Sequence, residues 1–145
     1  MEINKELIDS LIAKAEQSES KRAQFDLRTS LDDAGQRMLN VMLPGSEVAI
    51  HRHPRSSENV ILLSGKLYDV LYEEIINDAD TKGEIVHTAS GKRLRVTKRH
   101  LLDASSGNFG FIVPRGAWHR IEVLEPSAIY HAKDGKAGED GTESL

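Results

Sequence analysis

Between residues 36 and 132 the chain alternates short apolar stretches with turn-forming residues, and this pattern constrains the fold more than any other feature. Glycine, proline, asparagine and aspartate end strands and form tight turns. The turn signals are Pro44-Gly45, Ser64-Gly65, Asn77-Asp78, Lys82-Gly83, Ser90-Gly91 and Ser106-Gly107. Between them the sequence predicts strands over residues 37–43, 48–53, 58–63, 66–72, 84–88, 94–102, 109–113, 117–124 and 127–132. Many short strands with regular turns predict an all-β sandwich or barrel.

The two ends of the chain differ from this central part. Asn4 is a suitable N-cap for a helix that ends within residues 17–20. Its apolar residues fall on one helical stripe, formed by Ile3, Leu7, Ile8, Leu11, Ile12 and Ala15. We therefore expect residues 1–20 to form an amphipathic helix packed on a barrel of residues 21–132. Residues 133–145 are rich in Gly, Asp, Glu and Lys, which predicts a flexible tail.

Length, charge and composition exclude several classes of protein. The 145 residues fit one domain and contain no cysteine, so disulfides and thiolate ligands are excluded. No apolar stretch reaches transmembrane length, and the charged first residues lack the apolar core of a secretory signal. We expect a cytoplasmic protein without membrane contact. The basic run 92–100 alternates with apolar Leu94 and Val96, which is typical of an exposed strand, and the net charge is −4. Nucleic-acid binding is therefore not expected.

A histidine pair, His51 and His53, supplies the strongest chemical signal. In a strand these two side chains share a face, with Cα atoms roughly 6.5–7 Å apart. Both imidazoles can then reach one ion at about 2.0–2.1 Å. Glu58 begins the next predicted strand and is a candidate third ligand. His119 begins the strand 117–124, which an antiparallel barrel can place beside the pair. Three imidazoles and one carboxylate are a ligand set for first-row divalent metals.

The spacing of these residues resembles a known family. Gly45, His51-x-His53, Glu58 and Gly65 match the first cupin motif, and Pro114-x-Gly116-x-x-His119 matches the core of the second. Two positions depart from it: Asn108 stands where the motif begins with Gly, and Val123 stands where Asn is expected. Within the cupins, the chain resembles the WbuC-type metalloproteins. The segments that carry this resemblance are Arg22 to Arg28, 36–40, 43–46, 51–54, 112–114, 118–119 and 123–126.

The resemblance implies a jelly roll, which is a double-stranded β-helix, behind an N-terminal α-helix. It implies one divalent ion (zinc, iron, nickel or manganese) held by His51, His53, Glu58 and His119. It also implies a homodimer, with the helix and the basic hairpin as contact elements, and a link to surface-polysaccharide metabolism. A small polar metabolite such as a sugar or carboxylate is the expected ligand.

Four further residues are candidates for the site. His131 and Tyr130 are candidates for proton transfer, and Arg37 and Trp118 for substrate binding. Each has an alternative interpretation. His131 either enters the barrel or faces out, Arg37 either holds an anion or is an ordinary surface charge, and Tyr130 and Trp118 are also suited to core packing. His87 and His100 are expected on the surface.

The activity stays open between three classes. With iron, oxygen chemistry would make the protein a dioxygenase, whereas other ions would polarise a carbonyl for sugar isomerisation. Alternatively, the protein is a non-catalytic module that binds a metal and a sugar. A metal-free sugar epimerase is the third and weaker alternative, since such cupins usually lack the full ligand set.

Overall fold

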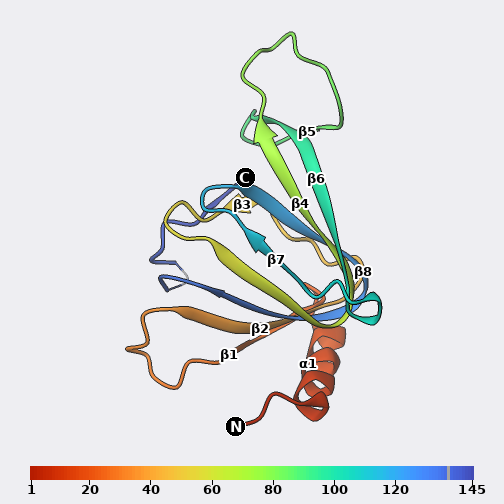
Figure 1. Ribbon diagram of the computed structural model, residues 1–145, viewed down its shortest axis with the longest axis vertical. Helices are drawn as coiled ribbons and strands as arrows, with labels where there is room; N and C mark the ends of the chain where they lie inside the picture. The colour runs from red at the N-terminus through yellow and green to blue at the C-terminus, as the bar shows by residue number, and fades with distance from the viewer. Residues whose placement is uncertain (137) are drawn as a thin grey trace.

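The structure is a computed structural model that describes residues 1–136 and 138–145. One N-terminal helix, α1 (Lys5–Gln17), precedes a chain of strands (Figure 1). The strands are β1 (Arg22–Asp26), β2 (Gln36–Met42), β3 (His51–Arg52), β4 (Glu58–Glu74), β5 (Ile85–His87), β6 (Arg93–Asp103), β7 (Gly110–Val113), β8 (Trp118–Lys133) and β9 (Glu143–Ser144). A short 3-10 helix, η1 (Ala104–Ser106), connects β6 to β7. None of the helices in the described ranges has the length and apolar run needed to cross a bilayer.

The strands form a curled antiparallel sheet with the main order β1-β2-β8-β4-β6-β5. β7 lies beside the first part of β4, and β3 lies beside the start of β8. This arrangement is the predicted all-β jelly roll with an N-terminal helix, although the sheet does not close completely. β1 was missing from the predicted strands, because its residues mix polar and apolar types without a turn signal before them.

Two strands, β4 and β8, each join two segments that the sequence predicted as separate strands, and in β8 these are residues 117–124 and 127–132. Residues 58–63 and 66–72 were expected as separate strands, but β4 runs continuously through both. Its register against β8 shifts between Leu62 and Leu67, so the Ser64-Gly65 signal marks a bulge and not a turn. Gly65 has φ +95°, and an added Cβ would lie 2.3 Å from the carbonyl oxygen of Pro126. Only glycine fits this crossing of β4 and β8.

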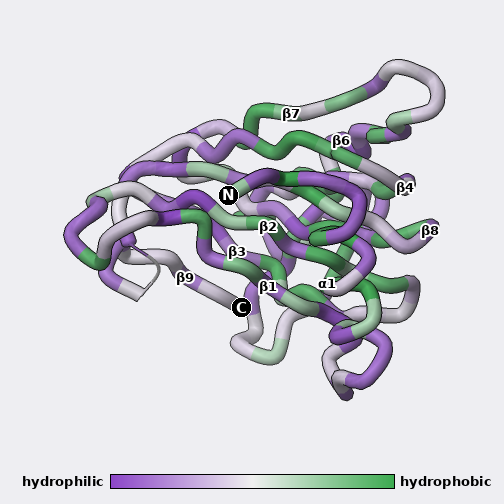
Figure 2. The backbone as a smooth tube through the Cα atoms, turned by 90° about the horizontal axis from the view of Figure 1, so that it is seen from below, coloured by the Kyte–Doolittle hydropathy of each residue, from purple (hydrophilic) through white to green (hydrophobic). Residues whose placement is uncertain are grey.

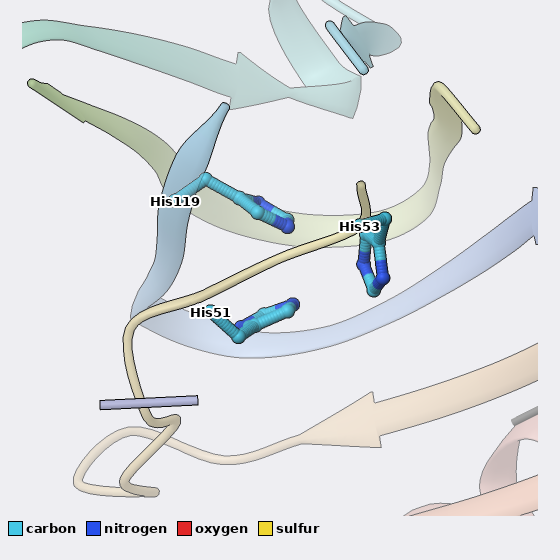
Figure 3. A group of neighbouring side chains, drawn as sticks. All are labelled: His51, His53 and His119. Carbon is cyan, nitrogen blue, oxygen red and sulfur yellow. The ribbon is translucent and has the colours of Figure 1, made fainter. Parts of the chain in front are cut away.

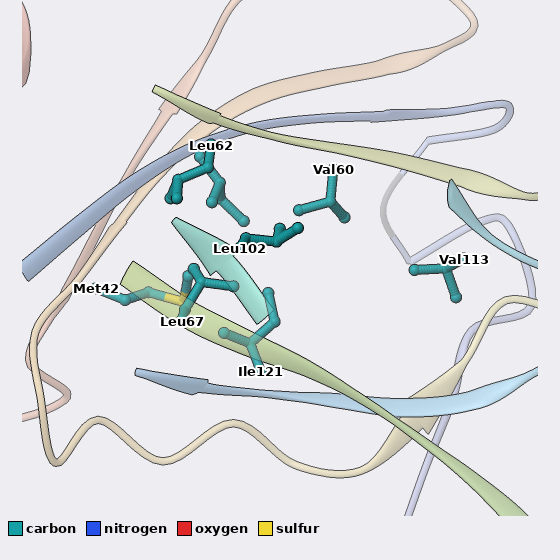
Figure 4. Packing of buried hydrophobic residues seen from close by; sticks show 8 residues of the cluster. Met42, Val60, Leu62, Leu67, Leu102, Val113 and Ile121 are labelled. Atoms are coloured by element: carbon teal, nitrogen blue, oxygen red, sulfur yellow. The ribbon is translucent and has the colours of Figure 1, made fainter. Parts of the chain in front are cut away.

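The two faces of the sheet are covered differently, and α1 covers the outer one. As predicted, Asn4 caps this helix by accepting a hydrogen bond from the backbone N–H of Leu7 at 3.0 Å. The helix packs Leu11 and Ala15 on the outer face of β2 and β8. The inner face carries the main core, whose buried members are Met42, Val60, Leu62, Leu67, Leu102, Val113, Ile121 and Ile129 (Figure 4). Alternate residues of β2 therefore face the helix and the barrel interior.

The C-terminal segment does not have the placement that its composition suggested. It was expected as a flexible tail, but β9 pairs with β3, and the N–H of Leu145 donates to the carbonyl of Ile50 at 2.9 Å (Figure 2). Asp140 is buried and forms an ion pair with Lys133, also buried. Polar composition does not reveal such docking, because the segment is held mainly by backbone pairing and a buried ion pair, with Leu145 as the one residue of its described part that packs on an apolar cluster. The tail thus reaches the strand that carries the histidine pair.

Candidate metal centre

Three histidines, from β3, from the residue directly after it and from β8, meet at one point inside the barrel (Figure 3). His51 begins β3 and lies opposite His119 of β8 in the antiparallel register. His53 follows one residue after β3, and its ring lies 5.0 Å from that of His51. One ligand atom from each of the three imidazoles lies within 4.8 Å of the others. His53 and His119 are buried, at 7% and 1% exposure. The structure therefore brings together the three histidines that the sequence predicted as ligands.

Two of the imidazoles are anchored through Nδ1 within the barrel. Nδ1 of His51 lies 2.8 Å from the carbonyl oxygen of Ala49, so this nitrogen donates. Nδ1 of His119 lies 3.0 Å from Oδ1 of Asp69, which is completely buried. An anchored Nδ1–H leaves the lone pair on Nε2, the tautomer that a metal requires. Asp69 was not among the residues predicted from the sequence. A lone carboxylate within the apolar stretch Leu67–Leu71 was a usable signal for a buried polar role.

The third imidazole is anchored by the C-terminal segment. The Thr142 hydroxyl donates to Oδ2 of Asp140 at 2.6 Å, so its oxygen can accept from Nδ1 of His53 at 2.9 Å. Asp140 in turn pairs with Lys133. Burial raises the pKa of Asp140, but hydrogen bonds from Lys133 and Thr142 outweigh it and lower that pKa to about 2. Asp140 is thus a stable anion that orients Thr142, and Thr142 orients His53.

Glu58, the predicted fourth ligand, lies beside the cluster at the start of β4. Its Oε2 is 3.2 Å from Nε2 of His53, and its Oε1 is 3.9 Å from Nε2 of His119. Burial raises the pKa of Glu58, but the neighbouring imidazoles, first of all the hydrogen bond from His131, bring that pKa below the ordinary range. The buried carboxylate of Glu58 therefore faces the Nε2 atoms of His53 and His119. These two rings already donate hydrogen bonds elsewhere through Nδ1.

This arrangement fits a bound cation. The Nε2 atoms of His53 and His119 are buried and have no hydrogen-bond partner among the described residues. With Nδ1 protonated, each of these nitrogens directs a lone pair toward an ionised carboxylate. Unpaired lone pairs in a buried site are unfavourable until a positive charge lies between them. Imidazole and carboxylate are the donor types that zinc, iron, nickel and manganese accept.

His131 is the one further candidate that faces the metal centre. Its Nδ1 lies 3.5 Å from Oε2 of Glu58, and its side chain lines a pocket of about 240 Å³ that the three histidines also line. Tyr130, the neighbouring residue on β8, points to the opposite face and packs against the cluster under α1. The strand alternation that brings His131 in thus places Tyr130 away from the pocket.

Arg37 and Trp118 lie elsewhere. Arg37 is exposed on β2, and its guanidinium pairs with Asp33 at 3.3 Å. Trp118 is buried in a separate apolar cluster, where its Nε1–H donates to Glu74 at 3.0 Å and Arg52 stacks on its ring. Strand parity again gives the reason, because Gln36 and Asn40 face the pocket while Arg37 between them faces outward.

The stability of the metal-free protein is expected to fall as the pH drops. Burial, with the nearby His119, lowers the pKa of His51 from 6.5 to about 4. Between these values the unfolded chain binds the proton more readily than the folded protein, so acid favours unfolding. We expect a loss of up to about 3 kcal/mol between pH 7 and pH 4, at 1.36 kcal/mol per pKa unit. Urea unfolding at several pH values, with His51→Gln as the comparison, measures it. Equal pH slopes in the two proteins would contradict the pKa shift of His51.

Structural comparison identifies the fold. The structure resembles the cupin domain of Cnp3 from Schizosaccharomyces pombe, with a TM-score of 0.53 and 13% identity, over 81% of this chain and 66% of that one. An oxalate oxidase in complex with glycolate matches with a TM-score of 0.54 and 15% identity, over 88% of this chain and 57% of that one. A cupin 2 domain-containing protein from Halorhodospira halophila has a TM-score of 0.54 and 16% identity, over 86% and 68% of the two chains. The chain thus spans less than two thirds of the first two proteins.

The structure thus has a cupin-like fold with a candidate metal centre formed by three histidines. The chain belongs to the family described as Domain of unknown function (DUF6016), whose profile matches residues 3–92. No curated protein sequence is significantly similar to the chain. The cupin resemblance noted from the sequence is therefore confirmed at the level of the fold, and the WbuC-type resemblance stays a prediction.

Proposed function

We propose that this protein binds one divalent metal ion and uses it to hold a small polar metabolite in the adjoining pocket. His51, His53 and His119 would hold the ion, with Glu58 as the fourth ligand. The observation that supports this most directly is the placement of the three Nδ1 atoms, each within hydrogen-bond distance of an oxygen. Each Nδ1 is anchored to a different acceptor, and each Nε2 is left for the same point. Independent anchoring of three rings is expected of a metal centre.

The ion, when bound, would act as a Lewis acid toward an oxygen of the metabolite. His131 is the group placed to move a proton. Because its Nδ1 faces the carboxylate of Glu58, its Nε2 carries the lone pair, and this nitrogen is buried without a hydrogen-bond partner among the described residues. An imidazole in that state can accept a proton from a carbon next to a carbonyl and return it to the neighbouring carbon. Isomerisation of a hydroxycarbonyl compound is therefore the proposed reaction class.

Two alternatives follow from the same site. A structural neighbour is an oxalate oxidase, which supports oxygen chemistry as the second candidate if the bound ion is iron. The third is a binding module that holds its ligand without turnover. The homodimer, the cytoplasmic location and the link to surface polysaccharides stay predictions of the sequence, and size-exclusion chromatography with light scattering tests the first of them.

The test begins with metal analysis and continues with exchange in D2O. Tag-free protein is incubated with iron, zinc, nickel or manganese, dialysed, and analysed by mass spectrometry for bound metal. We expect near one equivalent, and no bound metal would overturn the proposal. The loaded protein is then mixed with small aldoses, ketoses and sugar acids, and NMR follows solvent deuterium at carbon. His131→Gln is expected to slow exchange by about 10²-fold or more while retaining metal.

Absence of exchange separates the two alternatives. Oxygen consumption by the iron-loaded protein would favour the dioxygenase. Thermal stabilisation by one of the compounds, without exchange or oxygen uptake, would favour the binding module.

A further inference from the structure

One wall of the pocket is built by alternate residues of adjacent strands. Arg22 and Gln24 of β1 pair with Met42 and Asn40 of β2. Gln36 lies on the same face at the other end of β2, and His131 of β8 pairs with Met38 on that face. The register pairs Gln24 with Asn40, and β2 separates β1 from β8. The three metal-centre histidines line the same pocket. A molecule next to the metal centre would therefore contact a wall that combines amides and one guanidinium with apolar Met42 and Ile129.

Three acceptor atoms in this wall have no partner. Oδ1 of Asn40, Oε1 of Gln36 and Nε2 of His131 are buried and accept no hydrogen bond from the described residues. Asn40 is only 7% exposed, so solvent does not readily compensate its carbonyl. Buried polar groups are normally hydrogen-bonded, and a set of unpartnered ones in a pocket indicates where a ligand's groups belong. Acceptors require donors, and hydroxyl groups are the donors that small polar metabolites carry most often.

The same pocket holds a cation without a counterion. Arg22 is partly buried, and no hydrogen bond or ion pair joins its guanidinium to another residue in the described ranges 1–136 and 138–145. Nearby cations are already paired: Lys133 with Asp140, Arg28 with Asp26 and Arg37 with Asp33. A guanidinium binds a carboxylate through two parallel hydrogen bonds. One unpaired guanidinium matches one negative charge, whereas a phosphate dianion would call for a second cation.

Building on the proposed function, we infer that the metabolite is a compact hydroxylated monocarboxylate, of the sugar-acid class. Arg22 binds its carboxylate, Asn40 and Gln36 accept hydrogen bonds from its hydroxyl groups, and His131 keeps its role in proton transfer. A neutral sugar would leave Arg22 without a partner, and a simple fatty acid would leave the two amide acceptors without donors. Unpaired polar groups of this kind are what allow a site to reject close analogues. The pocket of about 240 Å³ limits the ligand to a short carbon chain.

A matched set of four-carbon compounds tests this inference. D-erythronate carries three hydroxyls and a carboxylate, erythritol has hydroxyls but no carboxylate, and butyrate has a carboxylate but no hydroxyls. Binding to the metal-loaded protein is measured by titration calorimetry, with protein-detected NMR for weak ligands. We expect erythronate to bind at least roughly tenfold more tightly than either analogue, since a hydrogen bond to a charged group is worth about one decade or more. Glycerol 3-phosphate serves as the phosphate probe.

Two substitutions assign the contacts. Arg22→Met is expected to weaken erythronate binding roughly tenfold or more and to leave erythritol unchanged. Asn40→Ala is expected to weaken erythronate and erythritol alike and to leave butyrate unchanged. Arg37→Met is the matched control, because Arg37 is the neighbouring cation that faces outward, and it should change none of these affinities. Circular dichroism and metal content, measured on each variant, show that the fold and the metal centre persist.

The outcomes separate this inference from the proposed function. If the metal-loaded protein does not bind erythronate, or if Arg22→Met binds it as tightly as the parent, the inference is overturned and the metal centre stands. Preference for glycerol 3-phosphate over erythronate overturns the monocarboxylate assignment. A parent protein that takes up no metal overturns the proposed function, and the inference falls with it.

Discussion

Replacing His119 with alanine is expected to abolish stoichiometric metal binding. His119 is buried to 1% exposure on β8, and its Nε2 faces the other two imidazoles, while Asp69 anchors its Nδ1. Loss of a residue that only orients a ligand typically costs 10–100-fold in metal affinity. Loss of a ligand itself should therefore exceed about 100-fold. Competition titration against a chromophoric chelator gives the affinity, and mass spectrometry gives the stoichiometry.

Two further variants complete this experiment. His51→Ala removes a ligand that is less buried, so it tests the site even if His119→Ala folds poorly, and it should show the same loss. His87→Ala removes an exposed histidine on β5, outside the metal-centre pocket, and should retain the parent affinity. Parent-like metal affinity in a folded His51→Ala protein would exclude His51 as a ligand. Equal losses in all three variants would point to unspecific binding by histidine.

The Thr142→Val variant is expected to lose about 10–100-fold in metal affinity, although Thr142 does not face the ion. Its hydroxyl links Nδ1 of His53 to the carboxylate of Asp140, at 2.9 Å and 2.6 Å. Valine keeps the shape of threonine but offers no acceptor, so Nδ1 of His53 loses the group that favours its protonation. A larger fraction of His53 would then carry the proton on Nε2, the atom that the metal requires.

Thr142→Ser is the matched control, because it retains the hydroxyl and should retain most of the affinity. Nitrogen-15 NMR of the imidazoles in metal-free protein reports the tautomer of His53 directly. A merely structural role of Thr142 would change stability without changing that tautomer. If Thr142→Val and Thr142→Ser bind metal equally, the tail does not position His53 in the way described.

The candidate metal ligands could be predicted from the sequence more completely than the residues around them. The spacing of His51 and His53 places both side chains on one face of any strand that contains them. The apolar stripe of α1 and its cap at Asn4 are equally local features. By contrast, Ser64-Gly65 predicts a turn in isolation but forms a bulge within β4, because a glycine with positive φ serves both purposes.

Which arginine faces the pocket could not be predicted from the sequence. The sequence left Arg37 open between an anion-binding role and an ordinary surface charge, and it gave Arg22 no role at the site. The structure places Arg22 in the pocket and Arg37 on the exposed side. Period-two alternation states which residues share a face, but only the pairing of the strands decides which face is inside.

The sequence by itself therefore determined the strand-rich fold, the N-terminal helix and the identity of the histidine cluster, because these depend on spacing within short segments. Tertiary structure alone decided that His131 faces the pocket while Tyr130 does not, and that Asp69 and Thr142 anchor two of the imidazoles. It also decided that residues near the C-terminus return to β3. The physical reason is that these contacts join residues as much as 93 positions apart, such as His51 and Ser144, and their formation depends on strand register and burial rather than on local preference.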